Sequence, residues 1–145
     1  MPSQYKLDAA YMDIALRWAK MSVAKRKQVG CIIVKDNQII SDGYNGTPTG
    51  FDNNCEFESR YGYETKREVL HAESNAITKL AKSPHSSLGA TMYITLSPCF
   101  DCAKLIIQSG VVRVVYGEEY TDTSGIELLR RANIDCSSFL EMSGS

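Results

Sequence analysis

The sequence has no excess of charge and no long run of hydrophobic residues. Its 16 lysines and arginines nearly balance 17 aspartates and glutamates, so the formal net charge is -1. This charge gives no overall attraction to phosphate polymers, which disfavours a nucleic-acid substrate unless a local basic patch exists. No apolar run approaches the roughly 20 residues of a membrane-spanning helix. Residues 1–6 also lack the apolar segment of a secretory signal, so we expect a cytoplasmic protein without a membrane partner.

Histidine is scarce, and the cysteines are odd in number. The chain has two histidines and five cysteines, and two of the cysteines are spaced as Cys99-x-x-Cys102. This pattern is typical of metal binding in a reducing compartment rather than of a disulfide framework. With 145 residues, of which 43% are hydrophobic, the chain is long enough for one compact domain, which we expect to span residues 1–145.

Strands and helices alternate in the second half of the chain. Helices are expected over residues 8–21, 71–82, 99–109 and 123–132, with Asp8 and Asp122 as candidate N-caps. Strands are expected over residues 29–34, 91–96, 111–116 and 134–139, and one more is expected to begin at residue 39. The strand over 29–34 and the strand that begins at 39 are expected to form a hairpin. Residues 43–48 and the polar, aromatic segment 51–69 are expected to be loops. The alternation predicts right-handed βαβ units. The expected fold is therefore α/β, a three-layer α/β/α sandwich around a mixed five-stranded sheet.

The strings His71-Ala72-Glu73 and Pro98-Cys99-Phe100-Asp101-Cys102 carry the chemistry. One imidazole and two thiolates can hold Zn²⁺ on three sides and leave its fourth position to water, as in catalytic sites. Both pairs lie at starts of predicted helices, where backbone N–H groups and the helix dipole favour thiolate. Glu73 can transfer protons if partial burial raises its pKa. We therefore expect two helix N-termini directed at one zinc ion.

A structural zinc with a fourth protein ligand is the alternative. Its candidate ligands are Cys31, Cys55, His85 and Cys136. None has the paired spacing of a second zinc knuckle, and a closed site would not explain Glu73. Cys31 and Cys136 lie in apolar, strand-like runs and are expected in the core, whereas Cys55 lies in the polar segment and has no assigned role.

Most of the chain, from the first helix to Ile134, resembles the deoxycytidylate (dCMP) deaminases of the cytidine deaminase superfamily. The zinc motif alone indicates only the superfamily. The loop Gly43-Tyr44-Asn45-Gly46-Thr47-Pro48 and the helix from Cys102-Ala103-Lys104 to Gln108-Ser109-Gly110 narrow the resemblance to the dCMP branch. The other supporting strings are residues 29–34, 71–77, 92–99 and Glu119-Tyr120 followed by Asp122.

The resemblance implies a cytidine deaminase-like fold and zinc-dependent hydrolysis of dCMP to dUMP and ammonia, in support of thymidylate synthesis. It further implies that Glu73 is catalytic, that Asn45 bonds the sugar or base, and that the Ala72 N–H and the Ser97 carbonyl contact the base edge. Tyr120 would stack on the nucleotide or close over it. Some relatives carry a second, structural zinc, but the scarcity of histidine predicts one zinc ion here.

The resemblance also implies regulation and assembly. Relatives are commonly homohexamers activated by dCTP and inhibited by dTTP with Mg²⁺, and residues Gly43, Tyr44, Asn45 and Gly46 would contribute to the effector site. The candidate cations for the 5′-phosphate are Arg60, Lys66, Arg67, Lys82 and Lys104.

Several of these residues also have a purely structural explanation. The Gly43–Gly46 loop could be a turn that needs positive φ, Asn75 could brace a helix start, Tyr120 could be ordinary packing, and each basic side chain could lie on a solvated surface.

Three other functions share parts of the pattern. A tRNA adenosine deaminase has the same two zinc strings, but the chain lacks excess positive charge and a basic C-terminal helix. Deaminases of guanine or of a riboflavin precursor fit the Tyr44-Asn45-Gly46 loop less well. A catalytically silent zinc module is disfavoured by the intact Glu73.

Overall fold

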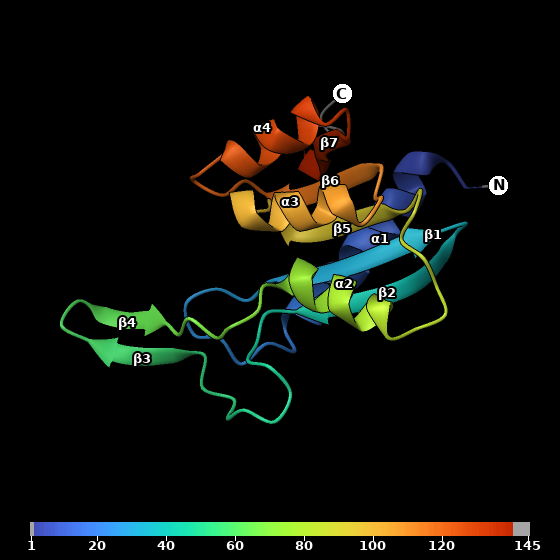
Figure 1. The fold of residues 1–145 in the computed structure, drawn as a ribbon. Helices are drawn as coiled ribbons and strands as arrows, with labels where there is room; N and C mark the ends of the chain where they lie inside the picture. Colours follow the sequence, from blue (N-terminus) through green and yellow to red (C-terminus); the bar gives the residue numbers. More distant parts are fainter. Residues whose placement is uncertain (1, 141–145) are drawn as a thin grey trace.

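The computed structural model describes residues 2–140, whose core is a five-stranded sheet with helices on both faces (Figure 1). The strand order is β2-β1-β5-β6-β7, in which β1 is antiparallel to β2 and β5, while β5, β6 and β7 are parallel. The bounds are β1 Gly30–Lys35, β2 Gln38–Tyr44, β5 Thr91–Leu96, β6 Arg113–Glu118 and β7 Asp135–Ser138. The mixed α/β sandwich predicted from the sequence is thus confirmed.

Alternation along β1 separates two layers of core. Ile32 and Val34 pack with Met12 and Ala15 of α1, Gln4–Ala19, on one face. Cys31 and Ile33 join the core that contains α2, α3 and α4 on the other face, as expected for a strand whose successive side chains point to opposite sides. These helices span Ala72–Ala81, Phe100–Gln108 and Ser124–Arg131. No helix in the described part of the chain is long and apolar enough to cross a membrane.

The β1–β2 hairpin forms where it was expected. Asp36 and Asn37 both have positive φ, at 51° and 60°. Two consecutive left-handed residues are the requirement of the tight turn whose twist matches a β-hairpin, and Asp and Asn tolerate that conformation best after glycine. The short polar run between two apolar strands therefore fixes this connection locally.

Three details of the sequence interpretation were wrong. Helix α1 begins at Gln4, with the Ser3 hydroxyl accepting the Lys6 N–H, so Asp8 lies inside the helix and is not its N-cap. The segment 51–69 is not a plain loop, because it contains the hairpin of β3, Glu56–Ser59, and β4, Gly62–Thr65, which projects from the sheet as an arm (Figure 1). Strand β2 also continues through Tyr44, so the loop starts later than predicted.

Asp122 is close to its predicted capping role. The N-cap of α4 is Thr123, which makes no side-chain capping bond. Asp122 stands one residue earlier, and its carboxylate accepts the Ser124 N–H at 2.9 Å. It therefore satisfies one of the free donors at this helix start.

Candidate active site and metal centre

One edge of the sheet collects the predicted site residues. The carboxyl ends of the parallel strands β5 and β6 lie at this edge, paired through Leu96 and Glu118. Because β1 is antiparallel to β5, its first residue, Gly30, lies at the same edge, paired with the last residue of β2, Tyr44. Segments that are far apart in the sequence thus meet where ligands commonly bind in α/β sheets.

The three predicted metal ligands form a compact cluster. The donor atoms of His71, Cys99 and Cys102 all lie within 4.8 Å of one another, and the His71 Nδ1 is 3.2 Å from the Cys102 Sγ and 3.5 Å from the Cys99 Sγ. These separations suit three ligands around one Zn²⁺ at about 2.0 to 2.3 Å each. His71 and Cys99 are the N-cap residues of α2 and α3, which confirms that two helix starts meet at the cluster.

No fourth side chain joins this cluster among residues 2–140. Cys31 and Cys136 are buried in the hydrophobic core, as predicted. Cys55 is also buried and lines the neighbouring pocket, with its thiol 3.8 Å from the Asn53 carbonyl. His85 lies in the connection after α2. The donor set therefore fits a zinc ion with one open coordination position rather than a closed structural site.

The pKa values of the two thiols are shifted in opposite directions. Hydrogen bonds from Cys102 and His71 lower the pKa of Cys99 to about 4. The hydrogen bond with Cys99, together with burial, raises the pKa of Cys102. A sulfur at a helix N-terminus is a favourable place for negative charge, so Cys99 presents a thiolate that attracts a cation.

Glu73 follows His71 by two residues and is nearly fully buried, with 4% of its surface exposed. Burial raises its pKa to about 7, although its own backbone N–H and the nearby His71 oppose the shift. Carboxyl groups with a pKa near neutrality can both accept and donate a proton. The expected raising of the Glu73 pKa by burial is thus confirmed.

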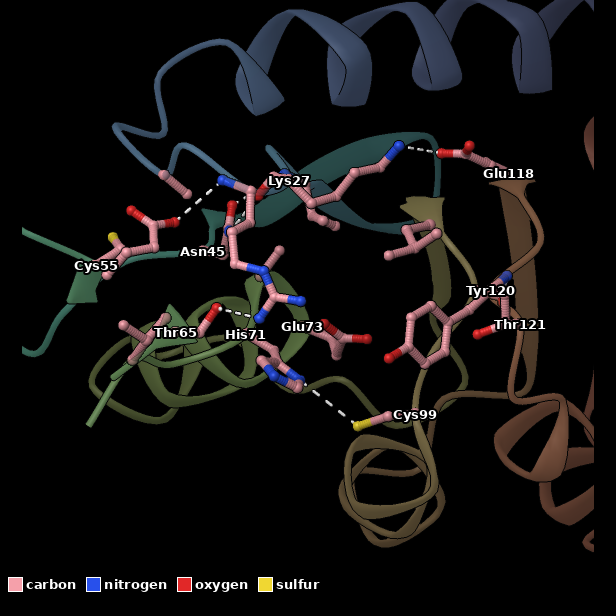
Figure 2. A pocket seen from close by; sticks show the side chains of 18 of the residues that line it. Lys27, Asn45, Cys55, Thr65, His71, Glu73, Cys99, Glu118, Tyr120 and Thr121 are labelled. Carbon is pink, nitrogen blue, oxygen red and sulfur yellow. Dashed lines mark hydrogen bonds and ion pairs between the residues drawn. The ribbon is translucent and has the colours of Figure 1, made fainter. Parts of the chain in front are cut away.

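A pocket of about 420 Å³ opens beside the cluster. Its lining includes His71, Glu73 and Cys99. The four residues that were predicted to contact a nucleotide also line it: Asn45, Ala72, Ser97 and Tyr120. Figure 2 shows the Tyr120 ring and the Glu73 carboxyl directed toward the middle of this pocket. The Tyr120 backbone N–H donates to the Ser97 hydroxyl at 2.8 Å, which joins the segment after β6 to the segment after β5.

Asn45 holds one wall of the pocket in place. Its Oδ1 accepts the Val29 N–H at 2.9 Å, and its Nδ2 donates to the Lys27 carbonyl at 2.7 Å. The Asn45 carbonyl accepts the Ser22 hydroxyl at 2.8 Å. The side chain therefore fixes the loop between α1 and β1 as well as facing the pocket.

The basic residues of the pocket differ from those considered in the sequence. Arg26 and Lys27 line it, whereas Arg60, Lys66, Arg67, Lys82 and Lys104 do not. Lys66 and Lys104 form ion pairs with Asp52 and Asp101 instead. The basic run Lys25-Arg26-Lys27 just before strand β1 could have indicated a phosphate site in the sequence. Its position near the zinc cluster, however, follows only from the pairing of β1 in the sheet.

The Gly43–Gly46 segment does not need positive φ, because neither glycine is among the residues with that conformation. The turn explanation for this loop was therefore wrong. Gly43 is buried against α2, where an added Cβ would lie 2.6 Å from the Ala72 carbonyl oxygen. Asn75 does brace this contact, since its Nδ2 donates to the Tyr44 carbonyl at 2.8 Å.

Comparison with known proteins agrees with this geometry. Residues 5–118 match the family described as the cytidine and deoxycytidylate deaminase zinc-binding region. The chain belongs to this family. The deaminase is 36% identical to the deoxycytidylate deaminase of Enterobacteria phage T4 over an alignment that covers 74% of this chain and 77% of that protein. It is also 36% identical to the Homo sapiens deoxycytidylate deaminase, over 78% of this chain and 66% of the human protein.

Solved structures place the deaminase in the same fold. The dCMP deaminase of cyanophage S-TIM5, in complex with dCMP and dUMP, superposes with a TM-score of 0.89 at 41% identity, covering 94% of this chain and 99% of that chain. A tRNA:A34 deaminase superposes with a TM-score of 0.63 at 24% identity, which shows a shared fold. The resemblance seen in the sequence is therefore confirmed at the level of the family.

Proposed function

We propose that this chain hydrolyses dCMP to dUMP and ammonia at a zinc ion held by His71, Cys99 and Cys102. The observation that carries the proposal is the three-donor cluster beside the buried Glu73 in a nucleotide-sized pocket. The phage and human relatives named as deoxycytidylate deaminases, and the related phage enzyme solved with dCMP and dUMP, support the choice of substrate.

Zinc held there supplies a Lewis acid that lowers the pKa of a water molecule toward neutrality. Glu73 accepts a proton from the attacking water and delivers it to ring atom N3 while the water oxygen bonds to C4. Glu73 then passes the second water proton to the amino group, so that the C4–N bond breaks and ammonia leaves. Both transfers need one carboxyl group with a pKa near neutral pH, which the buried Glu73 provides.

The pocket residues orient the base for this reaction. In the proposed complex the Ala72 N–H and the Ser97 carbonyl bond the base edge, Asn45 bonds the sugar or base, and Tyr120 stacks on the nucleotide. The burial of Ala72 and Ser97 suits such contacts, because polar backbone groups that face a closed site bond more strongly than in water.

Arg26 and Lys27 are the proposed partners of the 5′-phosphate. The Arg26 guanidinium donates to the Thr65 hydroxyl at 3.3 Å, and the Lys27 ammonium pairs with Glu118. Each cation can thus exchange its partner for a phosphate, which binds Arg and Lys through charge-assisted hydrogen bonds.

A substrate panel tests the proposal. The purified, zinc-loaded protein is incubated with dCMP, CMP, deoxycytidine and a tRNA anticodon stem, and the release of ammonia or the formation of inosine is measured. We expect dCMP to be the preferred substrate. Preference for deoxycytidine would remove the role of Arg26 and Lys27, and activity on the tRNA alone would replace the proposed function.

Substitution of Glu73 by Gln tests the proton transfer. The variant keeps the size of the side chain but cannot carry a proton between water and base, so we expect kcat to fall by at least about 100-fold while one zinc ion per chain is retained. Glu127→Gln makes the same change on the exposed face of α4 and should keep full activity. Normal turnover by the Glu73→Gln protein would refute the assignment.

We further propose that the enzyme is a cytoplasmic homohexamer, activated by dCTP and inhibited by dTTP with Mg²⁺. The proposed effector residues Gly43, Tyr44, Asn45 and Gly46 lie at the end of β2, next to the start of α2 that carries Glu73. An effector bound there would act on the same helix. Light scattering, together with rate curves at increasing dCMP with each effector, tests this; a hyperbolic curve unaffected by either nucleotide would contradict it.

A further inference from the structure

The acidic residues at the rim of the pocket differ in what they bind. Glu56, Glu118 and Glu119 all line the pocket with Arg26 and Lys27. The Glu56 carboxylate accepts the backbone N–H groups of Lys25 and Arg26 at 2.9 and 3.2 Å, so it holds the loop before β1. Glu118 instead forms an ion pair with the ammonium group at the end of the long Lys27 side chain, which belongs to the same loop.

The Lys27–Glu118 pair spans two separate elements. Lys27 precedes β1, and Glu118 is the last residue of β6. In Figure 2 this pair lies on the opposite side of the pocket from the His71–Cys99 contact, with the Tyr120 ring between them. In the proposed complex, where the base of dCMP lies beside Glu73, the 5′-phosphate would lie toward this pair.

This ion pair is easily exchanged. The side chains of Lys27 and Glu118 are 50% and 59% exposed, so water solvates both groups and their mutual attraction is weak. A 5′-phosphate carries nearly two negative charges at neutral pH and competes well for the ammonium. The Lys27 backbone meanwhile stays fixed, because its carbonyl accepts the Asn45 Nδ2. Exchange therefore needs only a rotation of the lysine side chain.

Glu118 remains at the rim after the exchange. A second phosphate joined to the first would bring further negative charge toward the freed carboxylate, and like charges in contact disfavour binding. A nucleoside without phosphate, in contrast, leaves the ion pair intact and gains nothing from Lys27. Rejection of unwanted ligands by a repulsive group is a common source of specificity.

We infer that Glu118 is a specificity-determining residue, which makes this site accept a nucleoside monophosphate and reject a diphosphate. The inference rests on the proposed deamination of dCMP. Lys27 would favour ligands with one phosphate over a nucleoside without phosphate, and Glu118 would disfavour ligands with a second phosphate.

The test compares kcat/KM for dCMP and dCDP in the zinc-loaded protein. We use dCDP rather than dCTP as the competing substrate, because dCTP is the proposed activator and could change the rate by binding at the effector site. In Glu118→Gln we expect the ratio of dCDP to dCMP activity to rise about five- to tenfold, mainly through a lower KM for dCDP. Glu118→Asp keeps the carboxylate and should keep the wild-type ratio.

Glu127→Gln is the matched control, because it removes the same charge from an exposed position on α4 outside the pocket. Its ratio should equal that of the wild type. An unchanged ratio in Glu118→Gln, an equal rise in Glu127→Gln, or a rise in Glu118→Asp as large as in Glu118→Gln would each overturn the inference. Absence of dCMP turnover in the wild type would instead refute the proposed function, so the two failures are distinguishable.

Discussion

Asp8 and Arg113 form a bidentate ion pair between α1 and β6. The two distances are 2.8 and 2.6 Å, and Asp8 is only 2% exposed. Tyr93 adds a hydrogen bond of 2.5 Å to the same carboxylate. Burial by itself would raise the pKa of Asp8, but the hydrogen bonds from Arg113, Tyr93 and Gln4 outweigh it and lower the pKa below its ordinary 3.8. The carboxylate is therefore stabilised in its charged form by folding.

Asp8→Asn should lower the free energy of unfolding by about 2 to 3 kcal/mol at pH 7, because it removes the buried carboxylate that the Arg113 guanidinium binds through two hydrogen bonds. The lowered pKa means that the contribution of Asp8 is fully present above its ordinary pKa and is lost as pH falls through the folded pKa. The difference between wild type and variant should thus be constant from pH 7 to 5 and shrink below about pH 4. Urea unfolding at several pH values measures it.

Asp135→Asn is the control for the Arg113 contact. Asp135 lies 3.9 Å from the Arg113 Nε, but its side chain is 66% exposed. Exposed pairs contribute about 0 to 1 kcal/mol, so this variant should differ little from the wild type. An equal loss of stability in both variants would show that the buried pair has no special role.

At the scale of elements, the end of β2 packs directly against the start of α2. In Gly43→Ala the new Cβ would lie 2.6 Å from the Ala72 oxygen and 2.7 Å from the Ala76 nitrogen. Both are backbone atoms of α2 and cannot rotate away, so the helix must shift together with Glu73. We expect a loss of about 1 to 3 kcal/mol in the free energy of unfolding and a lower kcat, measured by urea unfolding and ammonia release.

Gly46→Ala provides the comparison three residues later. An added Cβ there meets no atom within 4 Å, and the φ angle of Gly46 is not positive. The free energy of unfolding should be unchanged or rise by up to about 1 kcal/mol, because alanine restricts the unfolded chain. Comparable losses at both positions would show that close packing on α2 is not the reason for the glycine at 43.

At the scale of the whole molecule, the zinc cluster joins two helices that the chain separates. His71 begins α2, and Cys99 and Cys102 begin α3. Because the ion binds the folded arrangement, its removal by a chelator should lower Tm by about 8 °C if zinc is present at about 100 times its Kd. Thermal unfolding with and without chelator, and after zinc is restored, measures the effect.

Two cysteine variants separate zinc binding from general damage. Cys99→Ser removes a ligand and should abolish the response to the chelator. Cys55→Ser alters a buried thiol outside the ligand cluster, so it should keep its zinc and the full Tm shift. A chelator response that persists in Cys99→Ser would place the stabilising ion elsewhere.

The sequence by itself determined the helices and the five strands of the main sheet, apart from their exact ends, and the chemistry of the zinc cluster, but not the β3–β4 hairpin. Hydrophobic alternation and turn residues are local properties, and so are the spacings His71-x-Glu73 and Cys99-x-x-Cys102 at helix starts. Only the tertiary structure decided which distant residues share the pocket and the core. Lys27 meets Glu118 where β6 ends, and Asp8 meets Arg113 where β6 begins, instead of capping a helix. Strand pairing and helix packing bring these remote segments together at the two ends of β6. Such contacts depend on the register of the sheet, which no local pattern in the chain specifies.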